Sequence, residues 1–374
     1  VVSNPDKYTD VLKELNNNSG ILPDVVLYQL AFEAFEHTSQ YDTMIAAFLK
    51  KRHRSEEFSS LPNDITLKFS KMLDLRYGEN PHQKAAFYRD ADEATGLAVM
   101  KKLHGKELSF NNILDIQAAV DFIKDFSNPT VVIIKHNNPA GLAEDKSLSA
   151  AYRQAYACDP LSAFGGIIGL NRPVDLATAK LIDKSGFMEC IVAPEYAPEA
   201  LELLKQKKNV RVIELDLAQV KAGGYDYKKV AGGLLFQEKD EKGLNLADLK
   251  VVTKLKPSKG EMASIIFGWK AIKNIKSNAM ALVKGTKIVG VGCGQTSRVE
   301  SLQTAIMKAQ KNAKGSILIS DAFLPKTDNV LLAKKAGIKI IVQTGGSIAD
   351  PDVIKEADKA KIAMVFTGIR HFKH

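Results

Sequence analysis

The chain has 374 residues, of which 45% are hydrophobic and 25% are charged, with a formal net charge of +9 at pH 7. These proportions are those of an ordinary soluble globular protein. No run of about 18 uncharged apolar residues is present, which excludes a membrane-spanning helix. The length favours two or three domains of roughly 100–200 residues each.

The first fifty residues are expected to be helical. Asn4 can cap a helix whose first position is Pro5, and apolar residues recur at helical spacing from Asp24 to Leu49. The next stretch, Lys50–Asp64, loses this period and gains charge, Ser and Pro, so we place a domain boundary there. Because the N-terminus lacks both an initiator Met and a signal-peptide pattern, we expect a fragment of a longer protein.

Beyond residue 64, short apolar runs alternate with amphipathic segments, which predicts an α/β fold with covered sheets. The expected strands are Ile65–Phe69, Val131–Ile134, Gly166–Leu170, Cys190–Val192, Ile288–Val291, Ile317–Ile319, Lys339–Val342 and Ile362–Phe366. The expected helices are Asn112–Phe126, Leu148–Ala157, Leu176–Lys184, Glu199–Lys207, Glu261–Leu282, Arg298–Ala313, Asn329–Lys335 and Pro351–Ala360.

A faint internal repeat runs through this region. The same order of features occurs in Ser162–Pro194 and in Ser320–Gly346: a small residue with a Phe, then a loop, an Asp, a helix and an aliphatic strand. We therefore expect two similar α/β halves, over about 65–213 and 261–374, joined by a Gly- and Lys-rich connector over 214–260. Such halves would bring equivalent loops together at a shared cleft.

The cysteines and the positive charge give weaker indications of function. Cys158, Cys190 and Cys293 lie far apart, and no Cys/His cluster has zinc spacing. We expect a reducing, cytoplasmic setting in which these thiols are buried and inert. The excess of Lys and Arg favours anionic partners such as nucleic acid, phosphorylated metabolites or polycarboxylates, and a generally basic solvated surface explains it equally well.

The stretch IIKHNNPAG, Ile133–Gly141, ends an apolar strand in Lys135 and His136. Pro139 cannot donate to a ladder and Gly141 permits positive φ, so a turn is expected at once. A Lys cation beside the imidazole disfavours imidazolium, which would keep His136 neutral and able to accept a proton near pH 7. A surface Lys beside a structurally hydrogen-bonded His is the alternative.

Two glycine-containing stretches offer groups for an anion. LRYGENPHQ, residues 75–83, holds Arg76, whose planar fork suits phosphate, and Tyr77. VGCGQTSRVES, residues 291–301, predicts a strand, a glycine turn and a helix whose first turn bears Arg298. It fails as a dinucleotide fingerprint, because Ser297 takes the third glycine position. A surface Arg in one case and a tight turn in the other are the structural alternatives.

Three further stretches hold polar or aromatic groups. In SDAFLPKTDN, residues 320–329, Phe323 could stack on a flat heterocycle or lie in the core, and Asp328 could accept a hydrogen bond. In KSNAM, residues 276–280, Asn278 is expected on a long helix, facing either a substrate or solvent. The C-terminus, GIRHFKH, ends on basic residues and is either docked or disordered.

Together these stretches resemble one family. LRYGENPHQ, KHNNPAG, DPLSAFGG, KSNA, GQTSRVES, SDAF and RHFKH follow the order found in the transformylase part of bifunctional purine biosynthesis proteins. These proteins join a formyltransferase to IMP cyclohydrolase. The resemblance covers Ile65 to His374. It implies that residues 1–64 are the end of the cyclohydrolase domain with its linker, and that the catalytic part of that domain is absent from this chain.

The resemblance implies formyl transfer from 10-formyltetrahydrofolate to the 5-amino group of AICAR (5-aminoimidazole-4-carboxamide ribonucleotide), giving FAICAR on the way to IMP. This amine is a poor nucleophile, because its lone pair is delocalised into the ring and the carboxamide. A base must take its proton while a cation stabilises the developing oxyanion. By resemblance, His136 is the base and Lys135 the cation. A full-length parent would also carry IMP cyclohydrolase activity.

The resemblance also implies two sets of binding residues. Those expected at the nucleotide are Arg76, Tyr77, Gly165, Glu189, Asn278, Arg298, Phe323, Arg370 and His374. Those expected at the folate are Val299, Asp328, Ser347 and Ile348. Val299 and Ile348 would contact the folate mainly through their backbone.

The family fold is a duplicated cytidine-deaminase-like α/β/α unit, here preceded by a helical N-terminal segment. The zinc signature of deaminases is missing from this sequence, and we expect no metal in the chemistry. The resemblance implies a homodimer with sites at the subunit interface, and no nucleic-acid or membrane partner. A basic nucleic-acid-binding module and a nucleotide sensor without turnover are the alternatives, although the former lacks an RRM-type motif.

Overall fold

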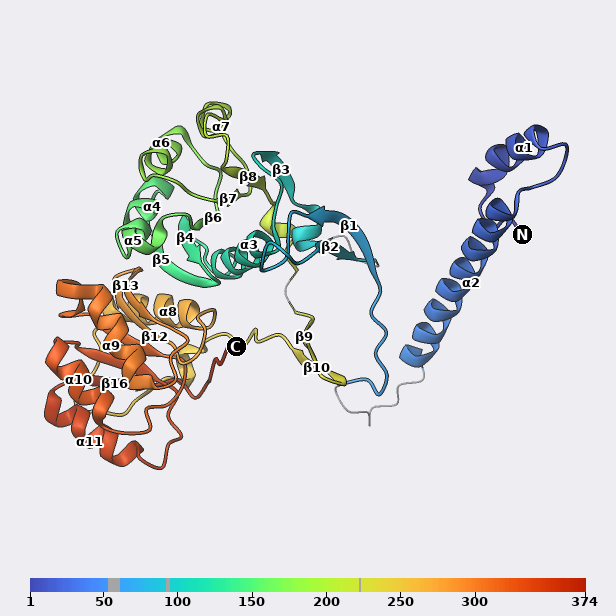
Figure 1. The fold of residues 1–374 in the computed structure, drawn as a ribbon. Coiled ribbons are helices and arrows are strands. Elements are labelled where there is room, and N and C mark those ends of the chain that lie inside the picture. The colour runs from blue at the N-terminus through green and yellow to red at the C-terminus, as the bar shows by residue number, and fades with distance from the viewer. Residues whose placement is uncertain (53–60, 92–94, 222) are drawn as a thin grey trace. The chain divides into compact units, whose positions relative to one another are not determined.

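The computed structural model describes residues 1–52, 61–91, 95–221 and 223–374. The chain divides into two units, Val1–Leu67 and Lys68–His374 (Figure 1). The middle of the linker expected over Lys50–Asp64 falls on residues 53–60 and lies outside the described residues. The domain limits expected from the sequence stay predictions.

The first unit is helical, as expected. Asn4 caps a short 3-10 helix, η1 (Pro5–Lys7), by accepting the backbone N–H of Asp6 at 3.0 Å. Two α-helices follow, α1 (Tyr8–Asn17) and α2 (Asp24–Arg52). In the part of the chain that the structure describes, no helix has the length and apolar character needed to cross a membrane.

The second unit contains two small antiparallel sheets. One pairs β1 (Phe69–Leu75) with β2 (Ala85–Asp90), and the other pairs β9 (Tyr225–Val230) with β10 (Gly233–Glu238). The strand expected over Ile65–Phe69 is therefore wrong, since the chain becomes a strand only at Phe69. Short 3-10 helices complete the irregular segments: η2 (Gly96–Val99), η3 (Leu217–Gln219), η4 (Leu246–Asp248) and η5 (Gln310–Ala313).

A 12-stranded mixed sheet organises the rest of this unit, in the order β11-β16-β15-β14-β12-β13-β5-β4-β6-β7-β8-β3. Its strands are β3 (Lys101–His104), β4 (Thr130–Lys135), β5 (Asn138–Glu144), β6 (Ile167–Leu170), β7 (Cys190–Ala193), β8 (Arg211–Glu214), β11 (Lys250–Val251), β12 (Met280–Lys284), β13 (Lys287–Gly292), β14 (Ile317–Ser320), β15 (Ile340–Gln343) and β16 (Ala363–Phe366).

The same pairing pattern occurs on either side of the junction between β5 and β13. In the first half, β4 pairs antiparallel with β5 and β6, while β6, β7 and β8 are parallel. In the second half, β12 pairs antiparallel with β13 and β14, while β14, β15 and β16 are parallel. Because β5 and β13 are antiparallel, the end of β4 and the ends of β14, β15 and β16 lie at the same end of the sheet.

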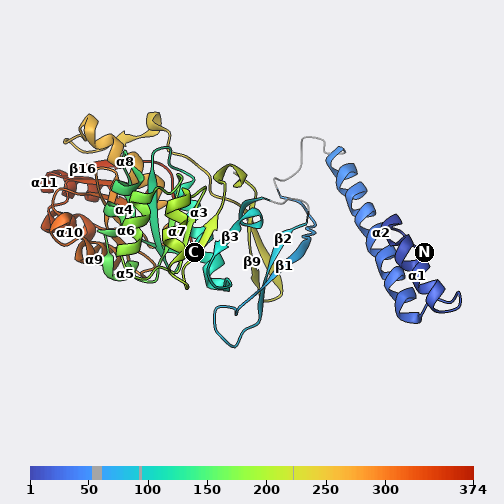
Figure 2. The same cartoon turned by 90° about the horizontal axis from the view of Figure 1, so that it is seen from above.

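Helices cover both faces of the large sheet (Figure 2). They are α3 (Phe110–Ile123), α4 (Leu148–Tyr156), α5 (Pro160–Ala163), α6 (Leu176–Lys184), α7 (Pro198–Lys205), α8 (Lys259–Ile272), α9 (Arg298–Ala309), α10 (Asp328–Ala336) and α11 (Asp350–Ala360). One apolar core lies beneath α3 and α8 and runs through both halves, and each half has its own core on the opposite face. On β4, Val132 and Ile134 face the shared core, whereas Val131 and Ile133 face the other one, as strand alternation requires.

Two further expectations about local structure are wrong. The helix expected over Glu261–Leu282 ends at Ile272, and its last part forms β12, so Asn278 lies in the loop before a strand. The turn expected over Asn-Asn-Pro-Ala-Gly is only His136 and Asn137, because β5 begins at Asn138. Pro139 lies inside β5, opposite Ile134, next to a shift in the strand register.

Gly141 is required for another reason than the positive φ expected there. It is absent from the described residues that have positive φ. A Cβ at this position would instead meet the carbonyl oxygen of Ala155 at 1.9 Å. Gly141 therefore lets β5 pack closely against α4.

Candidate functional site

The Lys-His pair lies at the turn between β4 and β5. Lys135 ends β4, and its ammonium donates hydrogen bonds to the carbonyl oxygens of Phe164 at 2.9 Å and Gly165 at 3.2 Å. An ammonium has three N–H donors, so one remains for a further acceptor. Gly165 adopts a φ of +66°, which favours glycine and presents its carbonyl to Lys135. The structure thus brings Lys135 and Gly165 together.

Glu189 lies nearby, immediately before β7. Its carboxylate accepts hydrogen bonds from the side-chain amide of Asn112 at 2.9 Å and from the guanidinium of Arg211 at 3.3 Å. The Arg211 side chain is only 4% exposed, while that of Glu189 is 38% exposed. A buried cation therefore holds a solvent-facing carboxylate, which is a fixed acceptor for a polar ligand.

Arg76 and Tyr77 dock against the start of α3. The N–H of Arg76 donates to Leu108 O at 3.0 Å, and the N–H of Phe110 donates to Tyr77 O at 3.2 Å. The guanidinium carbon of Arg76 lies 5.3 Å from the centre of the Tyr77 ring. These contacts place the LRYG segment beside the helix that also supplies Asn112.

In the second half, Asp321 is fully buried and organises several predicted residues. Its carboxylate pairs with the guanidinium of Arg298 and accepts the Ser277 hydroxyl at 2.6 Å and the Ala279 N–H at 3.1 Å. Asn278, between those two residues, donates from its side-chain amide to Gln295 O at 2.9 Å. Asn278 and Arg298 are therefore close together and fixed.

The C-terminal tail is docked on the same cluster. The N–H of His371 donates to Asp321 O at 3.0 Å, and the N–H of Ser277 donates to Lys373 O at 2.9 Å. Arg370 lies over the Phe372 ring at 4.5 Å, and Arg298 lies over that ring at 5.6 Å. The carbonyl oxygen of His374 accepts from Lys228 at 2.9 Å and also from Lys276. The sequence left open whether the C-terminal tail is docked or disordered, and in the structure the tail is docked.

The remaining predicted residues lie on loops and helix starts at this end of the sheet. Phe323 follows β14 and is 37% exposed, and Ile348 follows β15 and is fully exposed. The N–H of Ser347 donates to Asp350 at 3.1 Å, and Asp328 accepts the N–H of Asn329 at 2.7 Å. Val299 is in the first turn of α9. Their proposed contacts with a folate stay predictions.

A hydrogen bond joins the two halves next to the Lys-His pair. The side-chain oxygen of Asn138 accepts the N–H of Lys276 at 3.1 Å, and its nitrogen donates to His136 O at 3.2 Å. Burial, followed by the nearby cations Lys228 and Lys373, lowers the pKa of Lys276. The His136 turn and the KSNA loop are therefore neighbours within one chain.

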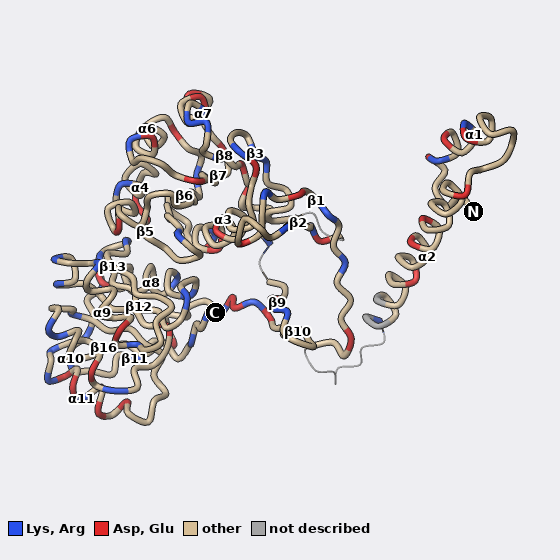
Figure 3. Tube along the Cα trace, in the orientation of Figure 1, with Lys and Arg blue, Asp and Glu red and all other residues tan. Residues whose placement is uncertain are grey.

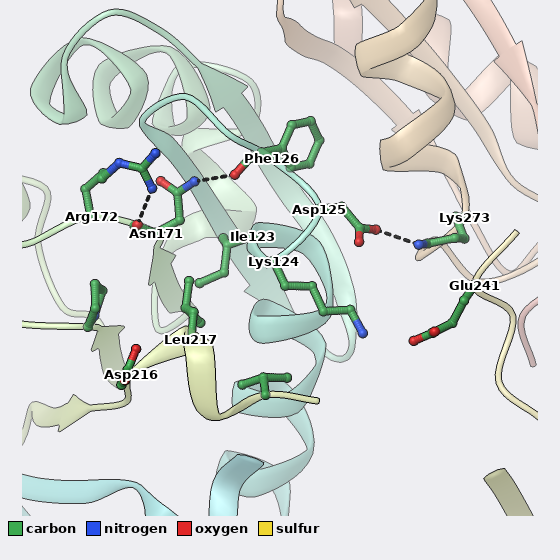
Figure 4. A pocket seen from close by; sticks show the side chains of 12 residues that line it. Ile123, Lys124, Asp125, Phe126, Asn171, Arg172, Asp216, Leu217, Glu241 and Lys273 are labelled. Atoms are coloured by element: carbon green, nitrogen blue, oxygen red, sulfur yellow. Dashed lines mark hydrogen bonds and ion pairs between the residues drawn. The ribbon is translucent and has the colours of Figure 1, made fainter. Parts of the chain in front are cut away.

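A separate pocket of about 520 Å³ lies elsewhere in the second unit (Figure 4). Its lining includes Asn171, Pro194 and Asp216, which follow β6, β7 and β8 at the opposite end of the sheet from His136. Lys273 pairs there with Asp125 at 2.6 Å, and Arg172 donates to the carbonyl of Asn171 at 2.8 Å. None of the residues expected at the active site lines this pocket.

Lys, Arg, Asp and Glu are interspersed along the second unit rather than gathered in one block (Figure 3).

Sequence reasoning missed three organising residues: Arg211, Asp321 and Asp115, whose carboxylate accepts the backbone N–H of Asn137 at 2.7 Å. Asp321 follows a buried strand directly, which is a usual place for a functional carboxylate in an α/β protein. Asp115 lies within an amphipathic helix, and Arg211 opens a short strand. Neither position carries a local signal, because their partners are distant in sequence.

The fold and site define an α/β protein with polar side chains gathered at one end of a large mixed sheet. Residues 1–308 match the family model described as the AICARFT/IMPCHase bienzyme. The chain belongs to this family, which confirms the resemblance drawn from its motifs.

Curated relatives cover the whole chain. The bifunctional purine biosynthesis protein PurH of Acetivibrio thermocellus is 47% identical over 380 residues, which span 100% of this chain and 72% of that protein. The proteins of the same name from Ruminiclostridium cellulolyticum and Thermoanaerobacter sp. are each 46% identical, with the same shares covered. By their names, these relatives are bifunctional proteins of purine biosynthesis.

Proposed function

We propose that this chain transfers a formyl group from 10-formyltetrahydrofolate to the 5-amino group of AICAR in purine biosynthesis. Family membership supports the pathway, and one structural observation supports this half of the bifunctional chemistry. The ammonium of Lys135 is held by two carbonyls beside His136, at a turn bonded through Asn138 to the loop that bears Asn278.

Lys135 and His136 have separate roles in this proposal. As the amine nitrogen attacks the formyl carbon, a C–N bond forms and the amine proton passes to a ring nitrogen of His136. The remaining N–H of Lys135 donates to the oxygen of the tetrahedral intermediate, where negative charge develops. Collapse of the intermediate breaks the bond to N10 of the folate, and that nitrogen receives the proton held by His136 as it leaves, which restores the neutral imidazole.

The nucleotide is held by residues from both halves. Arg76, Arg298 and Arg370 supply planar cations that suit a phosphate. Glu189 supplies a fixed acceptor, while Tyr77, Gly165, Asn278, Phe323 and His374 complete the expected set. The folate is expected at Val299, Asp328, Ser347 and Ile348. We propose that the chemistry needs no metal.

Several wider features belong to the same proposal. The two halves are cytidine-deaminase-like units, and the enzyme is a cytoplasmic homodimer with sites at the subunit interface. IMP cyclohydrolase activity is not expected of this chain, which spans 72% of the length of its relatives. The net charge of +9 attracts a phosphate and a glutamate-tailed folate, and no nucleic acid or membrane is required.

A spectrophotometric assay tests the proposal. The purified chain is mixed with AICAR and 10-formyltetrahydrofolate, and loss of the formyl donor and formation of FAICAR are followed. Turnover that depends on both substrates is the expected result. Binding of AICAR without consumption of the formyl donor would instead indicate a nucleotide sensor and overturn the proposal.

A further inference from the structure

The turn that carries His136 has an unfavourable backbone conformation. His136 and Asn137 have φ values of +51° and +62°, and they are the only residues between Lys135 and Asn138, which pair across β4 and β5. Two-residue hairpins of this kind require positive φ at both central positions and favour Asn-Gly. A residue with a Cβ is uncommon at positive φ, although His and Asn are found there more often than most residues. Contacts outside the hairpin would add to the stability of such a turn.

Asp115 of α3 makes such a contact. Its carboxylate accepts the backbone N–H of Asn137 at 2.7 Å. With its amide nitrogen turned toward α3, the Asn137 side chain donates to Asp115 Oδ1 and to Leu114 O, each at 3.2 Å. The turn is thus attached to a helix packed on the sheet, and the carboxylate satisfies a backbone donor that has no partner in the ladder.

The charge of Asp115 also acts on the Lys-His pair. Burial raises the pKa of Asp115, while the Asn137 N–H and then the charge of His136 oppose this effect. The ionisable groups at this end of the sheet include Lys135 from β4, Asp115 from α3, Glu189 and Arg211 beside β7 and β8, and Lys276 before β12, together with Arg298 and Asp321, which pair with each other. Glu189 is paired with Arg211, and Lys135 is bonded to two carbonyls. Asp115 is a carboxylate that both contacts the turn and interacts with the charge of His136.

We propose that Asp115 is a positioning residue for His136: its carboxylate holds the left-handed turn and stabilises the imidazolium formed when His136 accepts a proton. Lys135 disfavours that imidazolium and Asp115 favours it. The ammonium of Lys135 and the carboxylate of Asp115 therefore act in opposite directions on the basicity of His136. The kinetic consequence rests on the proposed formyl transfer, whereas the effects on the turn and on the imidazole do not.

The first experiment needs no enzymatic activity. The titration of His136 is followed by NMR in the full chain and in the Asp115→Asn variant, which keeps an oxygen acceptor but removes the charge. The titration of His136 is expected to move to lower pH, because the charge that stabilises the imidazolium is gone. Asp121→Asn, on the same helix but paired with Gln117, Lys124 and Lys373 rather than with the turn, is the matched control and should change the titration of His136 much less. An unchanged His136 titration in Asp115→Asn would overturn the electrostatic part.

The second experiment tests the hold on the turn. In Asp115→Ala, the amide hydrogen of Asn137 should exchange at least tenfold faster, because its acceptor is gone. Adding Asn137→Gly should restore a well-formed turn, since glycine suits positive φ at the second position. The proposal is overturned if exchange at residue 137 is unchanged in Asp115→Ala.

Kinetics then connect the turn to the reaction. Asp115→Asn should lower kcat with little change in AICAR affinity and move the rise of kcat with pH to lower pH. Asp115→Ala should lose more, and Asn137→Gly should recover part of that loss. Unchanged kinetics in both variants would contradict the role in catalysis. A wild-type chain without turnover would contradict the proposed function, and the NMR and exchange measurements would still decide the role of Asp115.

Discussion

Asn138 and Lys276 are joined by a 3.1 Å hydrogen bond between the side-chain oxygen of one and the backbone N–H of the other. The bond crosses from the first half of the large sheet to the second, and Asn138 also donates to the carbonyl of His136. The loop that contains Asn278 is therefore held at a fixed position relative to the turn that contains His136. A substrate bound by that loop would have its position relative to the imidazole fixed by the fold.

The first prediction concerns His136. His136→Ala should lower kcat by about 10²–10⁴-fold, because a positioned general base contributes a factor of this size. AICAR binding, measured by calorimetry, should remain. His37→Ala, on the exposed face of α2 in the other unit, is the matched control and should keep full activity. Retained turnover in His136→Ala would remove the assignment of the base.

The second prediction concerns the docked tail. Deleting residues 370–374 removes Arg370 and the backbone contacts of His371 and Lys373 with Asp321 and Ser277. AICAR affinity should weaken by roughly tenfold to a hundredfold, as expected when a charged hydrogen bond to a ligand is lost. Thermal unfolding of the same variant separates lost binding from lost folding. Unchanged affinity would show that the tail does not take part in the site.

Some of the fold was predictable from the sequence because its signals are local. The strands that became β14, β15 and β16 are short aliphatic runs with a helix between each pair, and this pattern identifies parallel strands without knowledge of distant contacts. The position of Lys135 and His136 at a strand end was also readable, since the apolar run Val131–Ile134 stops there.

The missed features depend on partners that are distant in sequence. β12 was merged into a helix because Lys276, Ser277 and Asn278 contain no Gly or Pro to mark the helix end. Asp115 looks like any polar residue of an amphipathic helix, and its role appears only when the turn at Asn137 packs against it. The pocket beside Asn171 needs side chains from several strand ends and from Lys273, which no single motif records.

The third prediction concerns thiol reactivity. Burial, assisted by the charge of Asp159, raises the pKa of Cys158 from 9.0 to about 12. The thiolate fraction at pH 8 should therefore fall by on the order of 1,000-fold, and alkylation should slow by a similar factor. Mass spectrometry after iodoacetamide treatment measures this, with the denatured chain as the control. The sequence predicted three buried thiols, but only Cys190 is buried, whereas Cys158 and Cys293 are partly buried. Rapid labelling of Cys158 in the folded chain would contradict its expected low reactivity.

The fourth prediction concerns Asp321. Asp321→Asn removes the charge that pairs with Arg298, whose side chain is 9% exposed. Breaking a buried ion pair in this way costs about 3–5 kcal/mol of folding free energy, because the remaining cation is buried without compensation. Chemical denaturation measures the loss. Glu202→Gln, which breaks an exposed pair with Lys205, should cost less than about 1 kcal/mol. Similar small losses in both variants would mean that Asp321 is not needed to hold Arg298.

The last prediction concerns Gly141, which ends the stretch that contains Lys135 and His136. A Cβ there would lie 1.9 Å from Ala155 O, so Gly141→Ala must push β5 and α4 apart or distort both. Overpacking of this kind costs about 1–3 kcal/mol and shifts the backbone. Because β5 begins at Asn138, the shift should reach the His136 turn and reduce turnover as well as stability. Gly243→Ala is the matched control, since a Cβ at Gly243 meets nothing within 4 Å. Equal unfolding free energies for the two variants would show that β5 and α4 can separate without cost.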